Sequence, residues 1–381
     1  MIVAVTGATG NIGSVLTRQL QDRGHDVRGI ARRVPRGGAD DDLRWYAVDL
    51  SKPDAWRELL PAFEGADDDL RWYAVDLSKP DAWRELLPAF EGADAVVHTA
   101  WGFQPTRDTA YLEALDVGGT HAVLRAARTA GVRHLVHVSS VGVYSPGRDA
   151  GAVDESWPRG GTADLTYSRD KAAAEQLLDA HEAAGGSRPV VTRIRPSLVA
   201  RGDIGGALDR YTLPSLLPAQ LVAHLPVLPL DRDFRLQLTH TEDIAAAIVS
   251  AVEGVVPGAF NLAAEPVLTR ADVARALAAR PLHLPWRVLR LLAGVAWTLR
   301  LQPVDPGWLD MAWDVPLMSS ERARRELDWS PSHDPRDVLE EAVAGMAGQT
   351  GAGSAALRPR RWAEQLANLL RHGPVSRRPM A

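Results

Sequence analysis

The chain has 381 residues, of which 46% are hydrophobic and 24% are charged, and its formal net charge is −5. This apolar fraction excludes a disordered chain, and the near balance of charges excludes a protein that binds nucleic acid mainly through phosphates. Cysteine is absent, which excludes disulfides, a thiolate nucleophile and a zinc site with Cys ligands.

Apolar strands and amphipathic helices alternate over the first 200 residues. Outside a repeated segment described below, we expect strands over residues 2–6, 26–31, 95–99, 134–139 and 190–195. We expect helices over residues 12–23, 109–130 and 167–184. This alternation predicts an α/β fold with a doubly wound parallel sheet that helices cover on both faces.

A glycine-rich turn, Thr6-Gly-Ala-Thr-Gly-Asn-Ile-Gly13, follows the first expected strand. Its first glycine permits a tight turn, its second lets the backbone approach a pyrophosphate, and its third allows the helix to pack closely on the strand. The helix N-terminus supplies N–H donors to the phosphates. We therefore expect this loop to bind a dinucleotide through Gly7, Thr9, Gly10, Asn11, Ile12 and Gly13.

The end of the second expected strand bears on the choice between NAD and NADP. It carries Arg32 and Arg33, and it lacks the acidic residue that usually binds the ribose 2′-hydroxyl of NAD. A guanidinium suits a 2′-phosphate by charge and by bidentate geometry. We expect a preference for NADP; the alternative is that both arginines are solvated loop residues.

Residues 38–64 and 65–91 are identical, so one strand-plus-helix unit occurs twice in tandem. A single duplication is not a solenoid, which needs three or more repeats. We expect the second copy to occupy the native position in the sheet, because its helix leads directly into the strand that starts at Ala95. The first copy would then lengthen a loop. The alternative arrangement keeps both copies and adds a strand at the sheet edge.

A candidate catalytic pair lies on the helix over residues 167–184. Tyr167 and Lys171 are four residues apart and so share one helix face, and Lys171 is the only lysine outside the repeat. A nearby ammonium is expected to lower the pKa of the phenol, which can then exchange a proton with a substrate hydroxyl or carbonyl. Ser140, after the strand over 134–139, is placed to bind the reacting oxygen; Ser139 is the weaker candidate.

These motifs resemble those of the extended short-chain dehydrogenase/reductases, the NAD-dependent epimerase/dehydratase type. The resemblance covers roughly residues 1–335 and is carried mainly by the glycine loop, by Val-Ser-Ser-x-x-Val-Tyr ending at Tyr144, and by Y-x-x-x-K. It implies a Rossmann-type domain, bound NAD(P) and a catalytic triad of Ser140, Tyr167 and Lys171. Weaker matches are Leu115–Thr120, Arg195-Pro196, His240–Ala245 and Arg322–Trp329.

The resemblance also implies contacts with the adenine. These would come from Asp76 and Leu77, or from Asp49 and Leu50 if the first copy holds the native position. Thr99 and Ala100, at the end of the strand over 95–99, are further expected cofactor contacts.

The chain also departs from the family pattern. Asp116 stands where the family often has Asn, and the residues after Arg195-Pro196 differ from the Val-Tyr-Gly-Pro common among nucleotide-sugar enzymes.

For several other residues, the sequence suggests a role in lining the substrate pocket, in maintaining the structure or in joining the two lobes. Trp101, and with it Phe103, follows the strand over 95–99 at the edge where open α/β sheets bind ligands, so it is expected to line the substrate pocket. His98 is expected to be structural, and His240 and Asp243 are expected to fix the junction between the two lobes. Residues 286–299 are expected to pack in the core; the alternative is a lid or interface for an apolar substrate. No cluster has the spacing of a metal site.

The expected domains are a Rossmann domain over residues 1–200, a mainly substrate-binding smaller lobe over 201–344 and a flexible basic tail over 345–381. The first hypothesis for the function is hydride transfer between NADP(H) and a secondary alcohol or carbonyl. The alternatives are a nucleotide-sugar epimerase or dehydratase with tightly bound NAD, and a non-catalytic NADP-binding sensor.

The expected partner is a small-molecule substrate, with no nucleic acid and no membrane, and a homodimer is left open. No apolar run is long enough to span a bilayer, and no signal peptide precedes the first strand, so the expected location is cytoplasmic.

Overall fold

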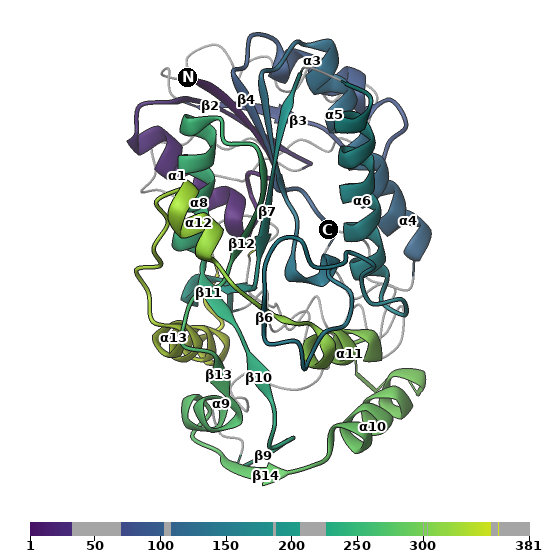
Figure 1. The fold of residues 1–381 in the computed structure, drawn as a ribbon, viewed down its shortest axis with the longest axis vertical. Helices are drawn as coiled ribbons and strands as arrows, with labels where there is room; N and C mark the ends of the chain where they lie inside the picture. Colours follow the sequence, from purple (N-terminus) through teal and green to yellow (C-terminus); the bar gives the residue numbers. More distant parts are fainter. Residues whose placement is uncertain are drawn as a thin grey trace.

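A computed structural model of the protein describes residues 1–32, 70–102, 108–185, 188–205, 226–299, 301–302, 304–351 and 357. In this part of the chain, a central sheet contains seven strands in the order β3-β2-β1-β4-β5-β7-β12 (Figure 1). Every neighbouring pair is parallel. The strands are β1 (Ile2–Thr6), β2 (Asp26–Ala31), β3 (Leu70–Ala74), β4 (Ala95–His98), β5 (His134–Val138), β7 (Val190–Pro196) and β12 (Gly258–Leu262). The expected doubly wound sheet of Rossmann type is therefore confirmed.

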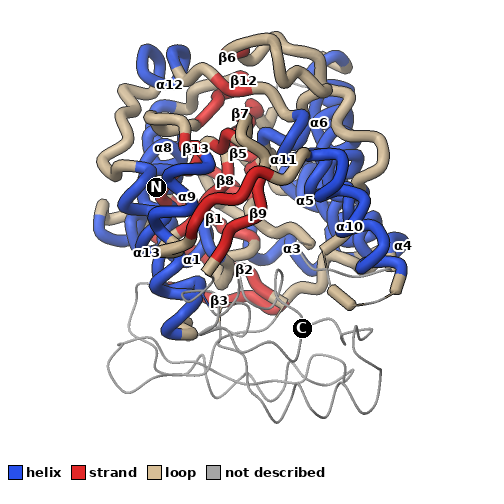
Figure 2. Tube along the Cα trace, turned by 90° about the horizontal axis from the view of Figure 1, so that it is seen from below, coloured by secondary structure: helices blue, strands red, loops and turns tan. Residues whose placement is uncertain are grey.

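Helices cover both faces of this sheet, as the view from below shows (Figure 2). One face carries α1 (Asn11–Asp22) and α8 (Thr241–Gly254), and the other carries α3 (Ala82–Phe90), α5 (Gly119–Thr129) and α6 (Thr166–Ala183). Strand β1 shows why both faces need cover. Val3 and Val5 belong to the apolar cluster with α1 and α8, whereas Ala4 belongs to the cluster on the opposite face. Alternate side chains of a strand point to opposite faces, so a fully apolar strand has to be buried on both.

The second copy of the repeat provides the edge strand of the sheet. Strand β3 pairs with β2 from Val27 opposite Leu70 to Ala31 opposite Ala74, and α3 follows it before the chain enters β4. This is the arrangement expected from the short junction before Ala95. The first copy, residues 38–64, lies outside the described residues.

Part of the chain after residue 200 belongs to the same layers as the central sheet and does not form a separate lobe. Strand β12 pairs with β7 in the central sheet, and α8 packs against α1 beneath it. Residues 241–262 therefore belong to the Rossmann-type layer, although they fall within the range 201–344 that was expected to be mainly a substrate-binding lobe. The sequence obscured this arrangement, since the chain leaves the sheet after β7 and returns to it some 60 residues later.

The remaining elements gather at the carboxyl-terminal edge of the sheet. Short strands pair there as β8 (Leu198–Ala200) with β11 (Leu238–His240), β9 (Val227–Leu230) with β14 (Arg280–His283), β10 (Arg235–Leu236) with β13 (Leu268–Thr269), and β6 (Ala152–Val153) with β15 (Leu317–Met318). The helices there are α9 (Arg270–Ala276), α10 (Trp286–Thr298), α11 (Pro306–Asp314) and α13 (Pro335–Gly348). Helix α12 (Glu321–Glu326) instead packs against β12 and belongs to the apolar cluster with α1 and α8. Helix α13 extends into the expected tail, and residues 358–381 of this tail lie outside the described residues.

Two segments differ in the structure from what the sequence predicts. The helix over 109–130 is interrupted: α4 (Thr109–Glu113) is joined to α5 by a π-helical turn over Ala114–Gly118. Residues 286–299 form α10, but none of its side chains is buried, so the expectation that they pack in the core is wrong. Within the described residues, no helix has both the length and the apolar character needed to cross a bilayer.

Candidate active site

One cavity of about 540 Å³ lies at the carboxyl edge of the sheet and collects most of the predicted site residues. Its wall includes the glycine loop, the residue after β2, the loop after β4, the end of β5 and the first turns of α6. The predicted residues that line it are Gly10, Asn11, Ile12, Gly13, Arg32, Thr99, Trp101, Ser140, Tyr167 and Lys171. Open α/β sheets bind their ligands at this edge because the loops at the switch point of the strand order leave a crevice there.

The glycine loop has the shape that a dinucleotide requires. Gly7 has φ +73°, a left-handed conformation, and a Cβ there would lie 2.6 Å from the backbone nitrogen of Ala100. A Cβ at Gly13 would lie 2.2 Å from the carbonyl oxygen of Gly7. Only glycine fits at either position, so the loop turns tightly and brings the N-terminus of α1 to the cavity. These residues therefore fit the pyrophosphate of a dinucleotide.

Only some of the other residues that were expected to bind the cofactor line the cavity. Arg32 lines the cavity, but its guanidinium donates a hydrogen bond of 2.5 Å to the Tyr111 hydroxyl. Arg33 lies outside the described residues. Gly7, Thr9, Ala100, Asp76 and Leu77 are not part of the cavity wall. The Asp76 carboxylate accepts hydrogen bonds from the backbone and hydroxyl of Ser78, and Leu77 is buried.

Ser140, Tyr167 and Lys171 meet in this cavity. A hydrogen bond joins the Ser140 hydroxyl to Tyr167, and the Lys171 ammonium lies 5.9 Å from the centre of the Tyr167 ring. Lys171 donates a hydrogen bond of 2.8 Å to the carbonyl oxygen of Val138 and lies 3.4 Å from the centre of the Trp101 ring. Ser139 also lines the cavity, but its hydroxyl donates a hydrogen bond of 2.6 Å to the carboxylate of Glu175.

The pKa of Tyr167 departs from the sequence-based expectation. Burial raises it to about 12, and the hydrogen bond with Ser140 opposes this increase only in part. The expected lowering by Lys171 is therefore not found. The reason is that Tyr167 packs between aromatic rings: Trp308 lies 4.8 Å away and Trp101 lies 6.3 Å away, centre to centre. In this apolar surrounding the phenol keeps its proton at neutral pH.

Asp116 belongs to the same cluster. It lies in the π-helical turn, and one of its carboxylate oxygens accepts a hydrogen bond of 2.6 Å from the backbone of Gly102. Its other oxygen is buried and has no hydrogen-bond partner among the described residues. Burial raises the pKa of Asp116, and burial lowers the pKa of nearby Lys171. Both shifts favour the neutral forms, in which the Asp116 carboxyl can present a hydrogen-bond donor as an Asn amide does.

A buried ion pair holds α6 against β7. The carboxylate of Glu175 accepts hydrogen bonds of 2.9 and 2.5 Å from Arg195, which is itself buried. Arg195 also donates to the Tyr144 hydroxyl at 2.9 Å. Since Glu175 lies one turn after Lys171 on α6, this network fixes the helix that carries Tyr167 and Lys171.

One wall of the cavity was not predicted from the sequence. Helix α11 contributes Trp308, Met311, Ala312 and Trp313, and the following residues Val315, Pro316 and Leu317 continue this apolar wall. Arg148, Arg235 and Gln237 are polar members of the wall, and Arg148 lies 3.6 Å from the centre of the Trp313 ring. From the sequence, Arg235 is a candidate only for contact with a substrate phosphate. No local sequence motif identifies α11 as part of this cavity. The only signal in the sequence that could have pointed to it is the high Trp content near residue 310.

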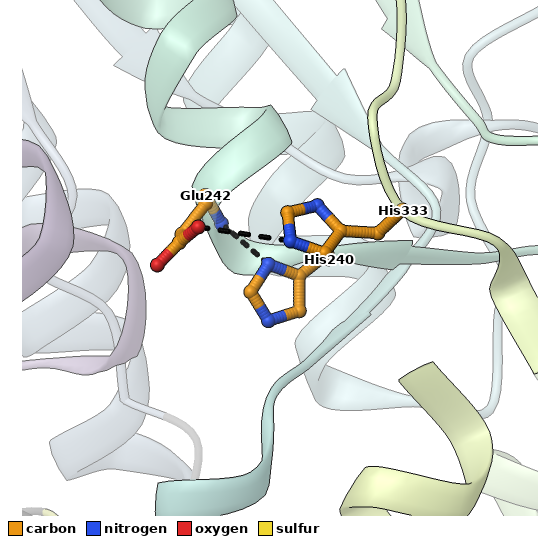
Figure 3. Close-up of side chains that lie close together, drawn as sticks. All are labelled: His240, Glu242 and His333. Carbon is orange, nitrogen blue, oxygen red and sulfur yellow. Dashed lines mark hydrogen bonds and ion pairs between the residues drawn. The ribbon is translucent and has the colours of Figure 1, made fainter. Parts of the chain in front are cut away.

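A second polar cluster lies outside this cavity (Figure 3). His240, Glu242 and His333 bring possible metal-ligand atoms within 4.8 Å of one another. However, the two imidazole rings are stacked, 3.9 Å apart at 29°, so their lone pairs do not converge on one point. His240 also caps α8 by accepting a hydrogen bond from the backbone of Glu242, and Asp243 binds Ser332 and His333. The cluster therefore joins α8 to the chain before α13.

Comparisons with known proteins identify relatives of this chain. A 3 beta-hydroxysteroid dehydrogenase/Delta 5→4-isomerase of Mycobacterium tuberculosis is 26% identical over 256 residues, which are 67% of this chain and 61% of that protein. The match thus spans less than two thirds of that relative. A ceramide reductase of Caulobacter vibrioides is 28% identical over 88% of this chain and 87% of its own length.

Solved structures show the same fold. The UDP-glucose 4-epimerase of Thermus thermophilus, solved with NAD, has a TM-score of 0.60 and 20% identity, over 91% of this chain and 99% of that one. The sequence profile of the NAD dependent epimerase/dehydratase family matches residues 3–263, which include the glycine loop, Ser140, Tyr167 and Lys171. The chain therefore belongs to the NAD dependent epimerase/dehydratase family.

Proposed function

We propose that the protein is an NAD(P)-dependent oxidoreductase that interconverts a carbonyl and a secondary alcohol on an apolar substrate. The observation that carries this proposal is a single cavity shared by the glycine loop, by Ser140, Tyr167 and Lys171, and by the apolar wall of α11. The named activities of the steroid and ceramide relatives, which concern apolar molecules, support this substrate class.

The residues divide the chemistry of carbonyl reduction as follows. The glycine loop and the N-terminus of α1 would hold the dinucleotide, whose nicotinamide would supply the hydride for the carbonyl carbon. The Tyr167 hydroxyl donates its proton to the carbonyl oxygen, and the raised pKa of Tyr167 keeps this proton in place until the oxygen becomes basic. The Ser140 hydroxyl hydrogen-bonds the same oxygen. The phenolate that remains favours the protonated form of Lys171, which is held by the Val138 carbonyl and stabilises the phenolate until it takes a proton from solvent.

NADP is the proposed preferred cofactor. Arg32 lines the cavity and carries the charge that suits a 2′-phosphate, although it must exchange its bond with Tyr111 for one with the phosphate. The glycine loop and the N-terminus of α1 would hold the pyrophosphate.

The test compares Tyr167→Phe with the parent chain. We expect the substitution to lower kcat for reduction of an apolar ketone by about 10²- to 10⁴-fold, because the proton donor is lost. NADPH affinity should stay close to that of the parent. The matched control is Tyr73→Phe on β3, outside the cavity, which should leave kcat unchanged.

Two outcomes would contradict the proposal. Full activity in Tyr167→Phe would remove Tyr167 from the reaction. Purification with stoichiometric NAD that does not exchange with NADPH would instead support the epimerase or dehydratase alternative.

A further inference from the structure

The exposed large hydrophobic side chains of this protein are concentrated in one region. Apart from Met1 and Leu198, all those that the described residues expose lie between Val227 and Leu301. They are Val227, Leu282, Val288, Leu291, Leu292, Val295, Leu299 and Leu301. A monomeric protein seldom exposes a contiguous apolar patch of this kind without a binding role.

Helix α10 carries most of this region on one of its faces. Residues 288, 291, 292, 295 and 299 follow the spacing of a single helical stripe. Leu291, Leu292 and Leu299 have exposed fractions of 64, 56 and 62%. The opposite side of α10 packs against α11, where the Trp286 and Trp313 rings stack 4.8 Å apart at 4°. Figure 1 shows α10 at the lower edge of the molecule, far from the central sheet.

The sequence of this segment carries basic residues and no acidic residue, although Asp310 of the neighbouring α11 pairs with one of the arginines. Residues 280–301 contain Arg280, Arg287, Arg290 and Arg300, but no Asp or Glu, in a chain whose net charge is −5. Arg290 is paired with Asp310 of α11 at 2.7 Å, and Arg287 is exposed. A helix with an exposed face of Leu and Val and with an exposed Arg beside it has the composition of a helix that lies in the interface of an anionic bilayer.

We propose that the exposed face of α10, with the adjoining end of β14, docks on the surface of an anionic lipid bilayer. The helix would lie flat in the headgroup region without crossing the bilayer. This proposal differs from the expectation from the sequence, which was that the protein has no membrane partner. Docking would also place the cavity next to the bilayer, because α11 packs on α10 with one part of its surface and lines the cavity with another. The proposal does not depend on the catalytic proposal.

The experiment measures binding of the full chain to vesicles of phosphatidylcholine alone or mixed with phosphatidylglycerol, by co-sedimentation. We expect binding to the anionic vesicles, several-fold weaker binding to the neutral ones, and weakening by salt. Leu291→Glu/Leu292→Glu should reduce binding by about tenfold or more, since two apolar anchors are replaced by charges. Both positions are exposed, so the thermal unfolding temperature should not change.

The matched control adds the same two charges elsewhere. Ala183→Glu/Ala184→Glu places them at the exposed end of α6 and should bind vesicles as the parent does. The proposal is overturned if the parent does not bind, or if the α10 variant binds equally well. It is also overturned if the α10 variant only dissociates a dimer, or if the chain binds only after removal of residues 352–381, because a second copy or the tail would then be the occupant.

Discussion

Glu175 is the residue on which the geometry of the catalytic helix depends most directly. It is buried, and its carboxylate is held by Arg195 and by the Ser139 hydroxyl. Burial alone would raise the pKa of Glu175, but the hydrogen bonds and charge of Arg195 outweigh burial and lower this pKa. The folded state therefore favours the carboxylate more than the unfolded chain does.

The substitution Glu175→Gln should lower the free energy of unfolding at pH 7 by about 3–5 kcal/mol, because it leaves the buried Arg195 without its counter-ion. A lowered folded-state pKa stabilises the protein above the ordinary pKa of Glu, and this contribution disappears as pH falls through the folded-state value. The difference between parent and variant should therefore shrink below about pH 4. Denaturant unfolding at several pH values measures it.

The control is Glu182→Gln, on the same helix, whose side chain is 44% exposed and pairs with Arg193. Arg193 is buried, but it remains paired with Asp179 at 2.9 Å when the half-exposed carboxylate of Glu182 is removed, so this variant should lose about 1 kcal/mol or less. A loss at Glu175 no larger than that at Glu182, or one independent of pH, would show that the buried pair does not have the role assigned to it.

At the scale of single residues, the sequence indicated the candidate catalytic residues but not the side chains that surround them in the structure. The family motifs pointed to Ser140, Tyr167 and Lys171, which the structure brings to one cavity. They did not show that Trp101 and Trp308 surround Tyr167, because Trp308 lies 141 positions further along the chain. The pKa of Tyr167 depends on that distant contact, so its direction was predicted wrongly.

At the scale of elements, the tandem repeat makes one strand-plus-helix unit redundant. The second copy supplies β3 and α3, while the connection from β2 to β3 contains the whole first copy. A longer connection costs closure entropy that grows only slowly with length. The sheet can therefore tolerate the duplication.

Deleting residues 38–64 should preserve the fold and raise the free energy of unfolding by roughly 1 kcal/mol, because the connection becomes shorter. NADPH affinity should be preserved or improved, since the extra copy begins a few residues after Arg32. Chemical unfolding and a cofactor titration measure the two effects.

A control chain in which a Gly/Ser segment of equal length replaces residues 38–64 should be as stable as the parent. If the deletion variant does not fold, or if the Gly/Ser chain is much less stable than the parent, both copies are structural.

The predictability of the other elements followed the strength of their local pattern. Long apolar runs such as β1 and β5 were predicted almost to their bounds, because a buried strand is apolar throughout. Pairs such as β9 with β14 were not predicted, since each short strand is specified by a partner far along the chain. Helix α10 was expected in the core because apolar composition does not reveal whether a neighbouring element covers it.

At the scale of the whole molecule, the cavity lies where the Rossmann-type sheet meets the later elements of the chain. The sheet and its loops supply the glycine loop and the three candidate catalytic residues, and α11 supplies the apolar wall. The part of the chain that follows β12 carries α11 and brings this wall over the edge of the sheet. The proposed cofactor binding and catalysis are thus attributed to the sheet and its loops, and the proposed preference for an apolar substrate is attributed to α11.

The central claim is that this cavity binds a nicotinamide dinucleotide, with Arg32 selecting the phosphorylated form. The most direct measurement is a fluorescence titration of the full chain with NADPH and NADH, alongside the variant Arg32→Ala. The account predicts saturable binding of both, tighter binding of NADPH, and loss of most of that preference in Arg32→Ala. Failure to bind either dinucleotide, or a preference for NADH that Arg32→Ala leaves unchanged, would contradict it.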